Sequence, residues 1–283
     1  MFGLSLGFGA VVGFSLGLTG GGGSIFAVPL LVYGLGVEPR EAVGISLAAV
    51  GTTALVGAIQ RLRSHEVEIR AGLLFAGAGI LGAPLGTWVG KFIPGTVLLV
   101  LFALLMLMVA VRMWLKASKK PEEAHIVRAR SYQDLDDRGA PACRHNPGGR
   151  LEFTAKCTIV MSAVGLLTGV LSGLFGVGGG FIIVPALVFF STMNIHRAVA
   201  TSLLVISLIS ASGVASYLIA GESLALDITG FFVLGGVLGL GLGTILSHRL
   251  SGAKLQKIFA LAMAGIALFI VIQNKSEKGA PPP

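Results

Sequence analysis

Two runs of glycine are the residues in this chain whose types and spacing best suit binding chemistry. The first run reads Gly17-Leu18-Thr19-Gly20-Gly21-Gly22-Gly23-Ser24, and the second reads Gly173-Leu174-Phe175-Gly176-Val177-Gly178-Gly179-Gly180. Consecutive glycines weaken a helix and permit positive φ, so we expect the backbone to unwind in both runs and to expose N–H groups. A short apolar helix is predicted to follow each run, and the free N–H groups and partial positive charge at its N-terminus favour an anion. The runs predict a cradle for a small anion that needs no buried lysine or arginine.

Neutral side chains near the two runs add hydrogen-bond donors to this predicted cradle. The predicted substrate-binding residues are Thr19, Gly20, Gly22, Gly23, Ser24, Ser46, Gln60, Gly176, Gly178, Gly179, Gly180 and Ser202. Further hydroxyl groups are available at Thr52, Thr53, Ser172, Thr201, Ser207 and Ser210. The alternative role is structural, because small residues let membrane helices approach closely and a serine or threonine often bonds its own helix. Runs of glycine favour the binding role, since packing alone requires glycines that are spaced along a helix.

Other kinds of site have little support in the sequence. Cys143 and His145 form a loose pair with no second pair nearby, which is too few ligands for a metal centre. The spans contain no Ser-His-Asp arrangement and no Glu-x-x-His motif, and the chain has no phosphate-binding loop of the Gly-x-x-x-x-Gly-Lys type. No Asp or Glu lies in the middle of a predicted span, so a proton relay of buried carboxylates is not visible. We therefore predict a protein that is not an enzyme and uses no cofactor.

The composition places these residues in a membrane protein. Of the 283 residues, 54% are apolar and 12% are charged, and the mean hydropathy is +0.89, whereas about a quarter of an ordinary soluble domain is charged. The net charge of +8 arises from basic residues in the short segments between apolar runs, which is typical of membrane proteins and argues against a nucleic-acid partner. The predicted spans are residues 43–59, 71–89, 96–115, 199–219, 228–246 and 255–272. Residues 2–36 and 158–193 each contain a glycine run and predict one long helix, a break and a shorter helix.

An internal repeat organises the chain. With a shift of 156 positions, residues 17–47 match residues 173–203 without an insertion, and 13 of the 31 positions are identical. We therefore predict a first transmembrane repeat at 1–116, a polar linker at 117–155, a second transmembrane repeat at 156–274 and a tail at 275–283.

The distribution of lysine and arginine predicts the topology. The short loops at 61–70 and 249–257 and the linker are rich in basic residues and are predicted to be cytoplasmic, with both termini outside. Each repeat then crosses the membrane an odd number of times, so the two repeats are inverted. The predicted fold is an all-α polytopic membrane protein with two inverted-topology repeats, each a glycine-broken helix pair followed by three transmembrane helices. Secondary transporters in the cell's inner membrane often have this architecture.

The motif around the glycine runs resembles the TauE/SafE family. The residues that carry the resemblance are Gly17-x-x-Gly20-x-Gly22-Gly23-x-x-x-x-Val28-Pro29, its copy Gly173-x-x-Gly176-x-Gly178-Gly179-x-x-x-x-Val184-Pro185, and the segments Arg40-Glu41-Ala42-Val43-Gly44 and His196-Arg197-Ala198-Val199-Ala200. The resemblance implies a secondary transporter that exports sulfite or a small organosulfonate such as sulfoacetate. The long linker and the replacement of Ser24 by Gly180 in the second run are departures that the resemblance does not explain.

Two other functions stay open at this stage. A passive anion channel would need a continuous pore and would not saturate, whereas a carrier saturates. A membrane assembly protein would use the glycines for helix packing alone. The expected partners are a small anionic substrate and the lipid bilayer, and a homodimer is compatible with the sequence.

Overall fold

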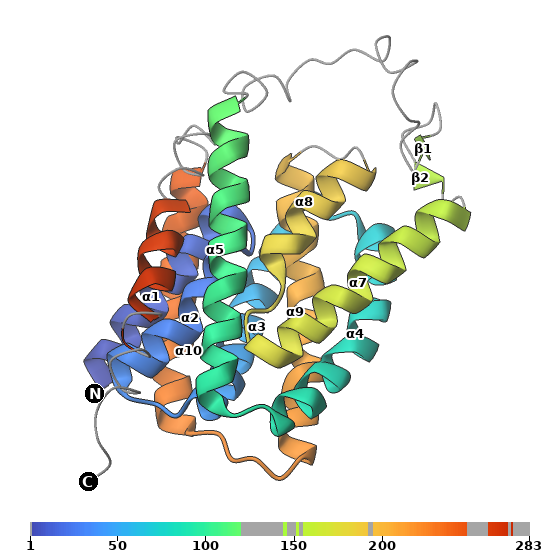
Figure 1. Ribbon diagram of the computed structural model, residues 1–283. Coiled ribbons are helices and arrows are strands. Elements are labelled where there is room, and N and C mark those ends of the chain that lie inside the picture. The colour runs from blue at the N-terminus through green and yellow to red at the C-terminus, as the bar shows by residue number, and fades with distance from the viewer. Residues whose placement is uncertain are drawn as a thin grey trace, which may run out of the picture.

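The computed structural model describes residues 2–119, 144–145, 151–152, 155–191, 195–247, 260–270 and 273. Within these ranges the regular secondary structure is helical, apart from one antiparallel pair of short strands, β1 (Arg144–His145) and β2 (Leu151–Glu152) (Figure 1). The helices of the first half are α1 (Phe2–Thr19), the 3-10 helix η1 (Gly22–Phe26), α2 (Ala27–Pro29), the π-helix η2 (Leu30–Gly34), α3 (Pro39–Arg63), α4 (Ile69–Phe92) and α5 (Gly95–Lys119). Those of the second half are α7 (Ala155–Phe175), α8 (Gly180–Ser191), α9 (Ile195–Ile219), α10 (Leu226–Ser247) and a helical segment at Ala260–Ile270.

Seven of the described helices are long and apolar enough to cross a membrane, namely α1, α3, α4, α5, α7, α9 and α10. Their outward faces carry large exposed apolar side chains such as Trp88, Phe92 and Leu238, which suit contact with lipid. The prediction of a polytopic, helical membrane protein is confirmed, and five predicted spans, from 43–59 to 228–246, lie within these helices. The span predicted at 255–272 is described only at Ala260–Ile270. Most of the linker and all of the tail lie outside the described residues.

Each unit that contains a glycine run folds back on itself. After α1 ends, the segment from η1 to η2 returns along it, since Gly23 lies against Ser15 and Gly34 lies against the ring of Phe8. In the second half α8 returns from the end of α7, and Gly179 lies against Thr168. The chain therefore leaves each unit on the side of the molecule where it entered.

The first helix of each half packs along a helix of the other half. Helix α1 packs along α10, and α7 packs along α4. Gly9, Gly13 and Gly17 of α1 lie against the backbone of Phe232, Gly236 and Leu240, and Gly165, Gly169 and Gly173 of α7 lie against that of Phe75, Gly79 and Ala83. Each of these three contacts of the first pair of helices recurs in the second pair, with a shift of 156 on one helix and 157 on the other. We call the contacts between α1 and α10 and between α7 and α4 the two seams. Glycine is required along them because the backbones leave no room for a side chain.

The order of the contacts gives the direction of each helix. Along both seams the residue numbers rise together, so α1 is parallel to α10 and α7 is parallel to α4. The central helices α3 and α9 are antiparallel, since Gly44 lies against Tyr217 and Gly57 lies against Leu203. Together with the short turns after α3 and α9, these directions make α1, α3 and α4 run opposite to α7, α9 and α10, respectively.

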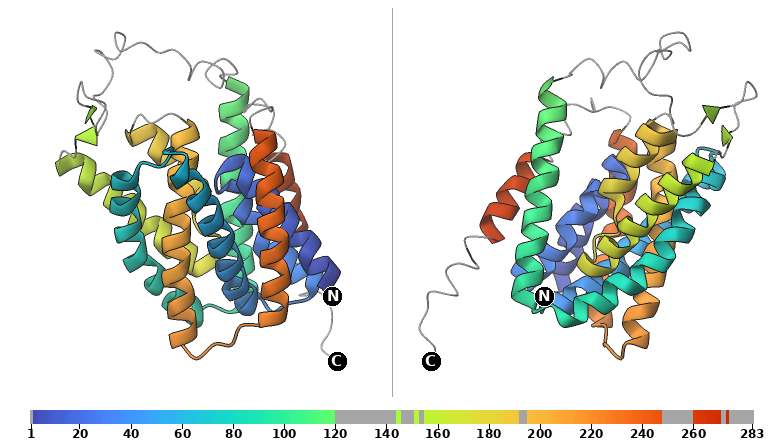
Figure 2. Two further views of the ribbon diagram at one scale, coloured as in Figure 1. Left: turned by 180° about the vertical axis from the view of Figure 1, so that it is seen from behind. Right: turned by 45° about the vertical axis from the view of Figure 1, so that its right-hand side comes forward.

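The molecule therefore has two faces that are defined by helix ends. We call the end where α5 finishes and α7 begins the linker face, and the end where α1 begins the terminal face (Figure 2). The turn between α3 and α4 lies at the linker face, and the turn between α9 and α10 lies at the terminal face (Figure 2). The two central helices α3 and α9 are the most deeply buried of the seven.

Candidate functional site

The backbone leaves the helical conformation in both glycine runs. In the first run Gly20 and Gly21 have φ angles of 71° and 143°. In the second run Gly176, Gly178 and Gly179 have φ angles of 70°, 67° and 70°. Side chains of L residues strain such conformations, so these positions require glycine. The chain then resumes as a 3-10 helix at Gly22 in the first half and as the 12-residue helix α8 at Gly180 in the second half.

The two unwound segments meet in the interior of the molecule. We call them together the glycine junction, residues 20–24 and 176–180. A Cβ atom on Gly180 would lie 2.4 Å from the Cα of Gly21, and the reverse substitution would leave 2.6 Å. Gly20 lies against Val199, and Gly176 lies against Val43 at the matching position of the other half. The structure thus brings the two runs together at Gly21 and Gly180, of which Gly180 is a predicted site residue. The predicted residues Gly22, Gly23 and Gly179 pack against their own half.

Serine hydroxyls fasten the glycine junction across the two halves. Ser46 donates a hydrogen bond of 2.5 Å to the carbonyl oxygen of Gly176, and Ser202 donates to that of Gly20. Ser24 donates to the carbonyl oxygens of Gly21, at 2.7 Å, and Val177. All three side chains are fully buried. In this conformation these predicted donors are therefore engaged with backbone carbonyls, and an anion would have to replace those acceptors.

Two other predicted residues have different surroundings. Thr19 is half-buried beside the junction, where its hydroxyl donates to the carbonyl oxygen of Ser15 at 2.8 Å and accepts from the N–H of Gly23 at 3.2 Å. Gln60 is exposed near the linker-face end of α3. It lies 14 residues after Ser46 in the same helix, which corresponds to about 21 Å along the axis. The structure does not bring Gln60 to the glycine junction.

Two buried hydroxyl groups lack a partner within the described part of the chain. They belong to Ser172, in the last turn of α7 before the break, and to Ser210 of α9. Both residues are fully buried. A Cβ atom on Gly178 would lie 3.6 Å from the Ser210 hydroxyl oxygen, so this group borders the second unwound segment. Buried polar groups are normally hydrogen-bonded, so each such exception calls for an explanation, of which a binding role is one.

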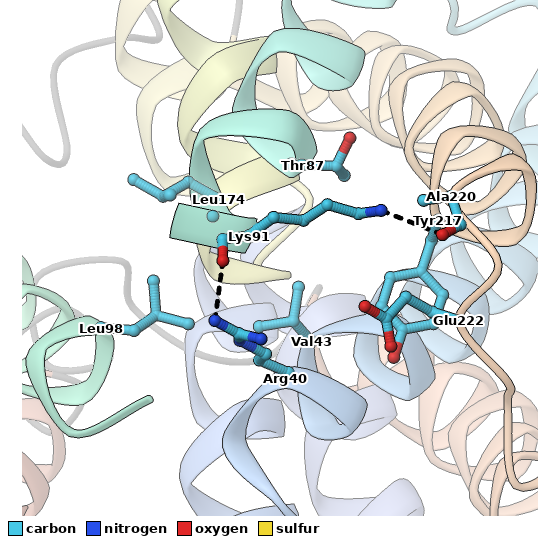
Figure 3. A pocket seen from close by; sticks show the side chains of 11 residues that line it. Arg40, Val43, Thr87, Lys91, Leu98, Leu174, Tyr217, Ala220 and Glu222 are labelled. Carbon is cyan, nitrogen blue, oxygen red and sulfur yellow. Dashed lines mark hydrogen bonds between the residues drawn. The ribbon is translucent and has the colours of Figure 1, made fainter. Parts of the chain in front are cut away.

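A pocket opens near the terminal face between α3, α4, α7 and α9 (Figure 3). Its lining includes the charged side chains of Arg40, Lys91 and Glu222 and the apolar side chains of Val43, Leu98 and Leu174. We call it the terminal pocket. Its other lining residues are Thr87, Gly90, Gly173, Tyr217 and Ala220. Because Val43 also contacts Gly176, the pocket extends to the edge of the glycine junction.

The two basic side chains of the terminal pocket bind backbone carbonyls at helix ends. Arg40 donates to the carbonyl oxygens of Lys91, at 2.8 Å, and Ile93, at 3.2 Å. Lys91 donates to the carbonyl oxygen of Ala220 at 2.9 Å and so joins α4 to the turn after α9 (Figure 3). A positive charge at a helix C-terminus also complements the helix dipole. Lys91 and Tyr217 are not among the residues that the sequence predicts; the lone lysine at the end of an apolar span was the signal for Lys91.

Ion pairs cluster at the linker face instead. Arg61, which is only 8% exposed, pairs with Glu66 at 3.1 Å. Arg197 of α9 pairs with Glu68 at 3.5 Å, and the backbone N–H of Glu68 donates to the Thr201 hydroxyl at 3.0 Å. The last two contacts join the two halves. Across the residues described here, no group of three or more His, Cys, Asp and Glu side chains could hold a metal ion.

Comparison with known proteins places this chain in a family. The model of the family described as "Sulfite exporter TauE/SafE" matches residues 5–270. A "Probable membrane transporter protein" of Xylella fastidiosa strain Temecula1 is 37% identical over 274 residues, which cover 95% of this chain and 94% of that protein. The "Probable membrane transporter protein YunE" of Bacillus subtilis strain 168 is 30% identical over 222 residues, covering 76% and 77%. No solved structure matches. The chain, with its two glycine runs and seven apolar helices, therefore belongs to the TauE/SafE family of membrane transporter proteins.

Proposed function

We propose that this protein is a secondary transporter that exports a small anion, sulfite or a small organosulfonate, across the inner membrane. In this proposal, access alternates at the interface between two inverted repeats, and the anion binds at the glycine junction. The family supports the substrate class, since its model is described as a sulfite exporter. The remaining parts of the proposal are supported by the arrangement of the helices and by the unpaired hydroxyl groups.

The inverted repeat is supported by the directions and contacts of the helices. The first, third and fourth helices of one half run opposite to their counterparts in the other half, and the glycine contacts along the two seams recur with shifts of 156 and 157 residues. Inverted repeats of this kind commonly bind substrate where the two copies meet, at discontinuous helices near the middle of the bilayer. The glycine junction is the place where two discontinuous helices meet in this protein.

The observation that carries the proposed site is the pair of unpaired hydroxyls beside the second break. Ser172 and Ser210 are fully buried and without a partner among the described residues. The N-terminus of α8, at Gly180, lies in the same unwound segment and carries backbone N–H groups and a partial positive charge. Hydroxyl groups and helix N-termini both suit an anion, and neither requires a buried basic side chain. Ser172 and Ser210 are therefore proposed as donors to the substrate when the junction opens.

Substitution of the unpaired serines tests this site without disturbing the fold. Ser210→Ala and Ser172→Ala each remove a buried hydroxyl group that has no partner among the described residues, so thermal stability should stay unchanged or rise. Loss of a hydrogen bond to a charged ligand costs about 1.5–3 kcal/mol, so transport should fall about ten- to hundredfold. The measurement is counterflow of sulfite and of sulfoacetate by purified protein in liposomes.

The matched control is Ser207→Ala. Ser207 is buried in the same helix as Ser210, but its hydroxyl bonds the carbonyl oxygen of Leu204 at 2.8 Å. This variant should retain counterflow. Full counterflow in both Ser172→Ala and Ser210→Ala would refute the proposed site, and flux without saturation or counterflow would identify a channel instead.

A further inference from the structure

The turns at the two faces of the molecule share one backbone conformation. His65, between α3 and α4, has a φ angle of 56°, and Gly221, at the matching position between α9 and α10, has a φ angle of 81°. In both turns a glutamate N–H donates to the carbonyl oxygen five residues earlier, from Glu66 to Arg61 at 3.2 Å and from Glu222 to Tyr217 at 3.4 Å. Positive φ is uncommon for a residue other than glycine, so His65 indicates how closely the turn geometry is repeated.

The walls of the terminal pocket recur at the linker face in the same way. With shifts of 156 or 157 residues, Arg40, Thr87, Tyr217 and Glu222 correspond to His196, Thr244, Arg61 and Glu66. The apolar floor corresponds too, since the contact of Val43 with Gly176 matches the contact of Val199 with Gly20. The linker face thus has the parts of a second pocket on the other side of the glycine junction.

We propose that the linker face forms a second access pocket for the same small anion, closed in this structure and lined by Gly17, Arg61, Glu66, His196, Val199 and Thr244. It opens when the terminal pocket closes. This inference rests on the proposed transport function and adds the residues that admit the anion from the linker side.

The ion pairs and hydrogen bonds at the two faces support a closed pocket at the linker face. The guanidinium group of Arg61 pairs with Glu66 at 3.1 Å, whereas the matching residue beside Glu222 is Tyr217, which has no positive charge. Arg61 and Glu66 both belong to the first half, whereas the Arg197–Glu68 pair and the bond from Glu68 N–H to Thr201 hold the two halves together at this face. At the terminal face the bond from Lys91 to the carbonyl of Ala220 joins the halves through an exposed side chain.

Arg61 has two roles in this scheme. While it pairs with Glu66, its buried side chain occupies the proposed pocket and so closes the linker face. When the pair separates, the guanidinium group is free to bind the anion through charge-assisted hydrogen bonds, which are short and strong. On the terminal side Arg40 and Lys91 line the pocket and offer positive charge in the same way, although Glu222 shares their pocket.

Paired cysteine variants test this inference directly. Thr87→Cys reports on the terminal pocket, and Thr244→Cys reports on the matching position at the linker face. Each is made in the full chain, with and without Glu66→Gln, and is reconstituted in liposomes. The rate of modification by a thiosulfonate reagent that carries a sulfonate group is then measured, with the chain lacking these two substitutions as the background control for Cys143 and Cys157.

Glu66→Gln should raise the rate at Thr244→Cys and lower the rate at Thr87→Cys. Each change should be about three- to tenfold, since a partly buried ion pair biases a two-state equilibrium by roughly this factor. The control variant is Arg63→Gln, which removes an exposed charge from the same turn and should leave both rates within about twofold. Arg61→Lys retains a positive charge and should open the pocket less than Glu66→Gln does.

Two results would overturn the inference. An unchanged rate at Thr244→Cys in the Glu66→Gln variant would mean that the ion pair closes nothing. Rates that rise at both positions would mean general loosening in place of exchange between two pockets. A reciprocal change in a protein that transports none of the tested anions would support the two pockets while refuting the proposed substrate, so the two proposals fail separately.

Discussion

Ser24 and Gly180 occupy matching positions in the two halves, and the surroundings of the two residues differ. The Ser24 hydroxyl reaches the carbonyl oxygen of Val177 in the other half, while Gly180 has no side chain and packs its backbone against Gly21. Among the described residues, the two buried hydroxyls without a partner are those of Ser172 and Ser210 in the second half, and the matching residues of the first half are Leu16 and Ala54. The two halves are therefore alike in backbone contacts and unlike in polar groups.

This difference separates two demands on the duplicated sequence. The glycines along both seams are needed for the helices to approach each other. A larger residue at one of them disrupts a contact that recurs at the matching position of the other seam. Polar groups are free to differ under the proposed function, because a substrate at the junction would meet both halves at once. In this structure the Ser24 hydroxyl of the first half bonds across the junction. The second half supplies Ser172 and Ser210, and its break is followed by the regular α-helix α8, where the first half has 3-10 and π-helical segments.

The largest expected effect tests whether the two seams contribute equally to stability. Gly13→Leu and Gly169→Leu place a Cβ atom 1.9 Å from the carbonyl oxygen of Gly236 and 2.1 Å from that of Gly79, respectively. Backbone cannot yield as a flexible side chain does, so each variant should lose several kcal/mol of stability and accumulate little folded protein. Yield of monodisperse protein and thermal unfolding in detergent measure the effect.

The matched control for the seam variants is Gly77→Leu. Gly77 is exposed on α4 and has nothing within 4 Å of the position of an added Cβ. This variant should fold normally. If Gly13→Leu unfolded the protein and Gly169→Leu did not, the two seams would not be equivalent.

A smaller effect is expected from alanine at two matching glycines of the junction. Gly178 has a φ angle of 67°, and an added Cβ would lie 2.9 Å from Ile206 and 3.1 Å from Val50. Gly22 lies outside the left-handed region, and its nearest neighbour would be the Thr19 hydroxyl at 3.2 Å. Gly178→Ala should therefore cost about 2 kcal/mol or more of the free energy of unfolding, and Gly22→Ala less than about 1 kcal/mol.

Thermal unfolding of these two variants shows whether glycines that align in the repeat are under the same conformational constraint. The sequence treats Gly22 and Gly178 as equivalent, since they align in the repeat. Equal costs for both substitutions would show that space, and not the sign of φ, limits the junction.

The spans and the breaks follow from the sequence because they depend on local composition. Apolar runs of about 20 residues give α3, α4, α5, α9 and α10, and runs of glycine end α1 and α7. The pairing of α1 with α10 is a different matter. Glycines at every fourth position, such as Gly9, Gly13 and Gly17, reveal a packing face, but many helices in this chain have such faces. Only the three-dimensional arrangement decides which face meets which.

The candidate site also has one part that the sequence predicts and one that it does not. The two glycine runs are predicted from the sequence and meet in the structure, whereas Gln60 lies far along α3 because a helix of 25 residues separates its two ends. The acceptors of Ser46 and Ser202 are 130 and 182 residues distant along the chain, so no local pattern identifies them. Lys91 joins the terminal pocket through a turn of the other half, which sequence spacing does not reveal either.

The smallest expected effect concerns these two serines, which are the one matched pair of polar groups at the junction. Ser46→Ala leaves the buried carbonyl of Gly176 without this donor, and Ser202→Ala does the same for Gly20. Each should lower the free energy of unfolding by about 1 kcal/mol, the usual net contribution of such a bond, and thermal unfolding of both variants measures it. Since the two bonds are related by the repeat, their costs should agree within about 0.5 kcal/mol. A clear inequality would mean that the asymmetry of Ser24 and Gly180 extends to the backbone of the junction.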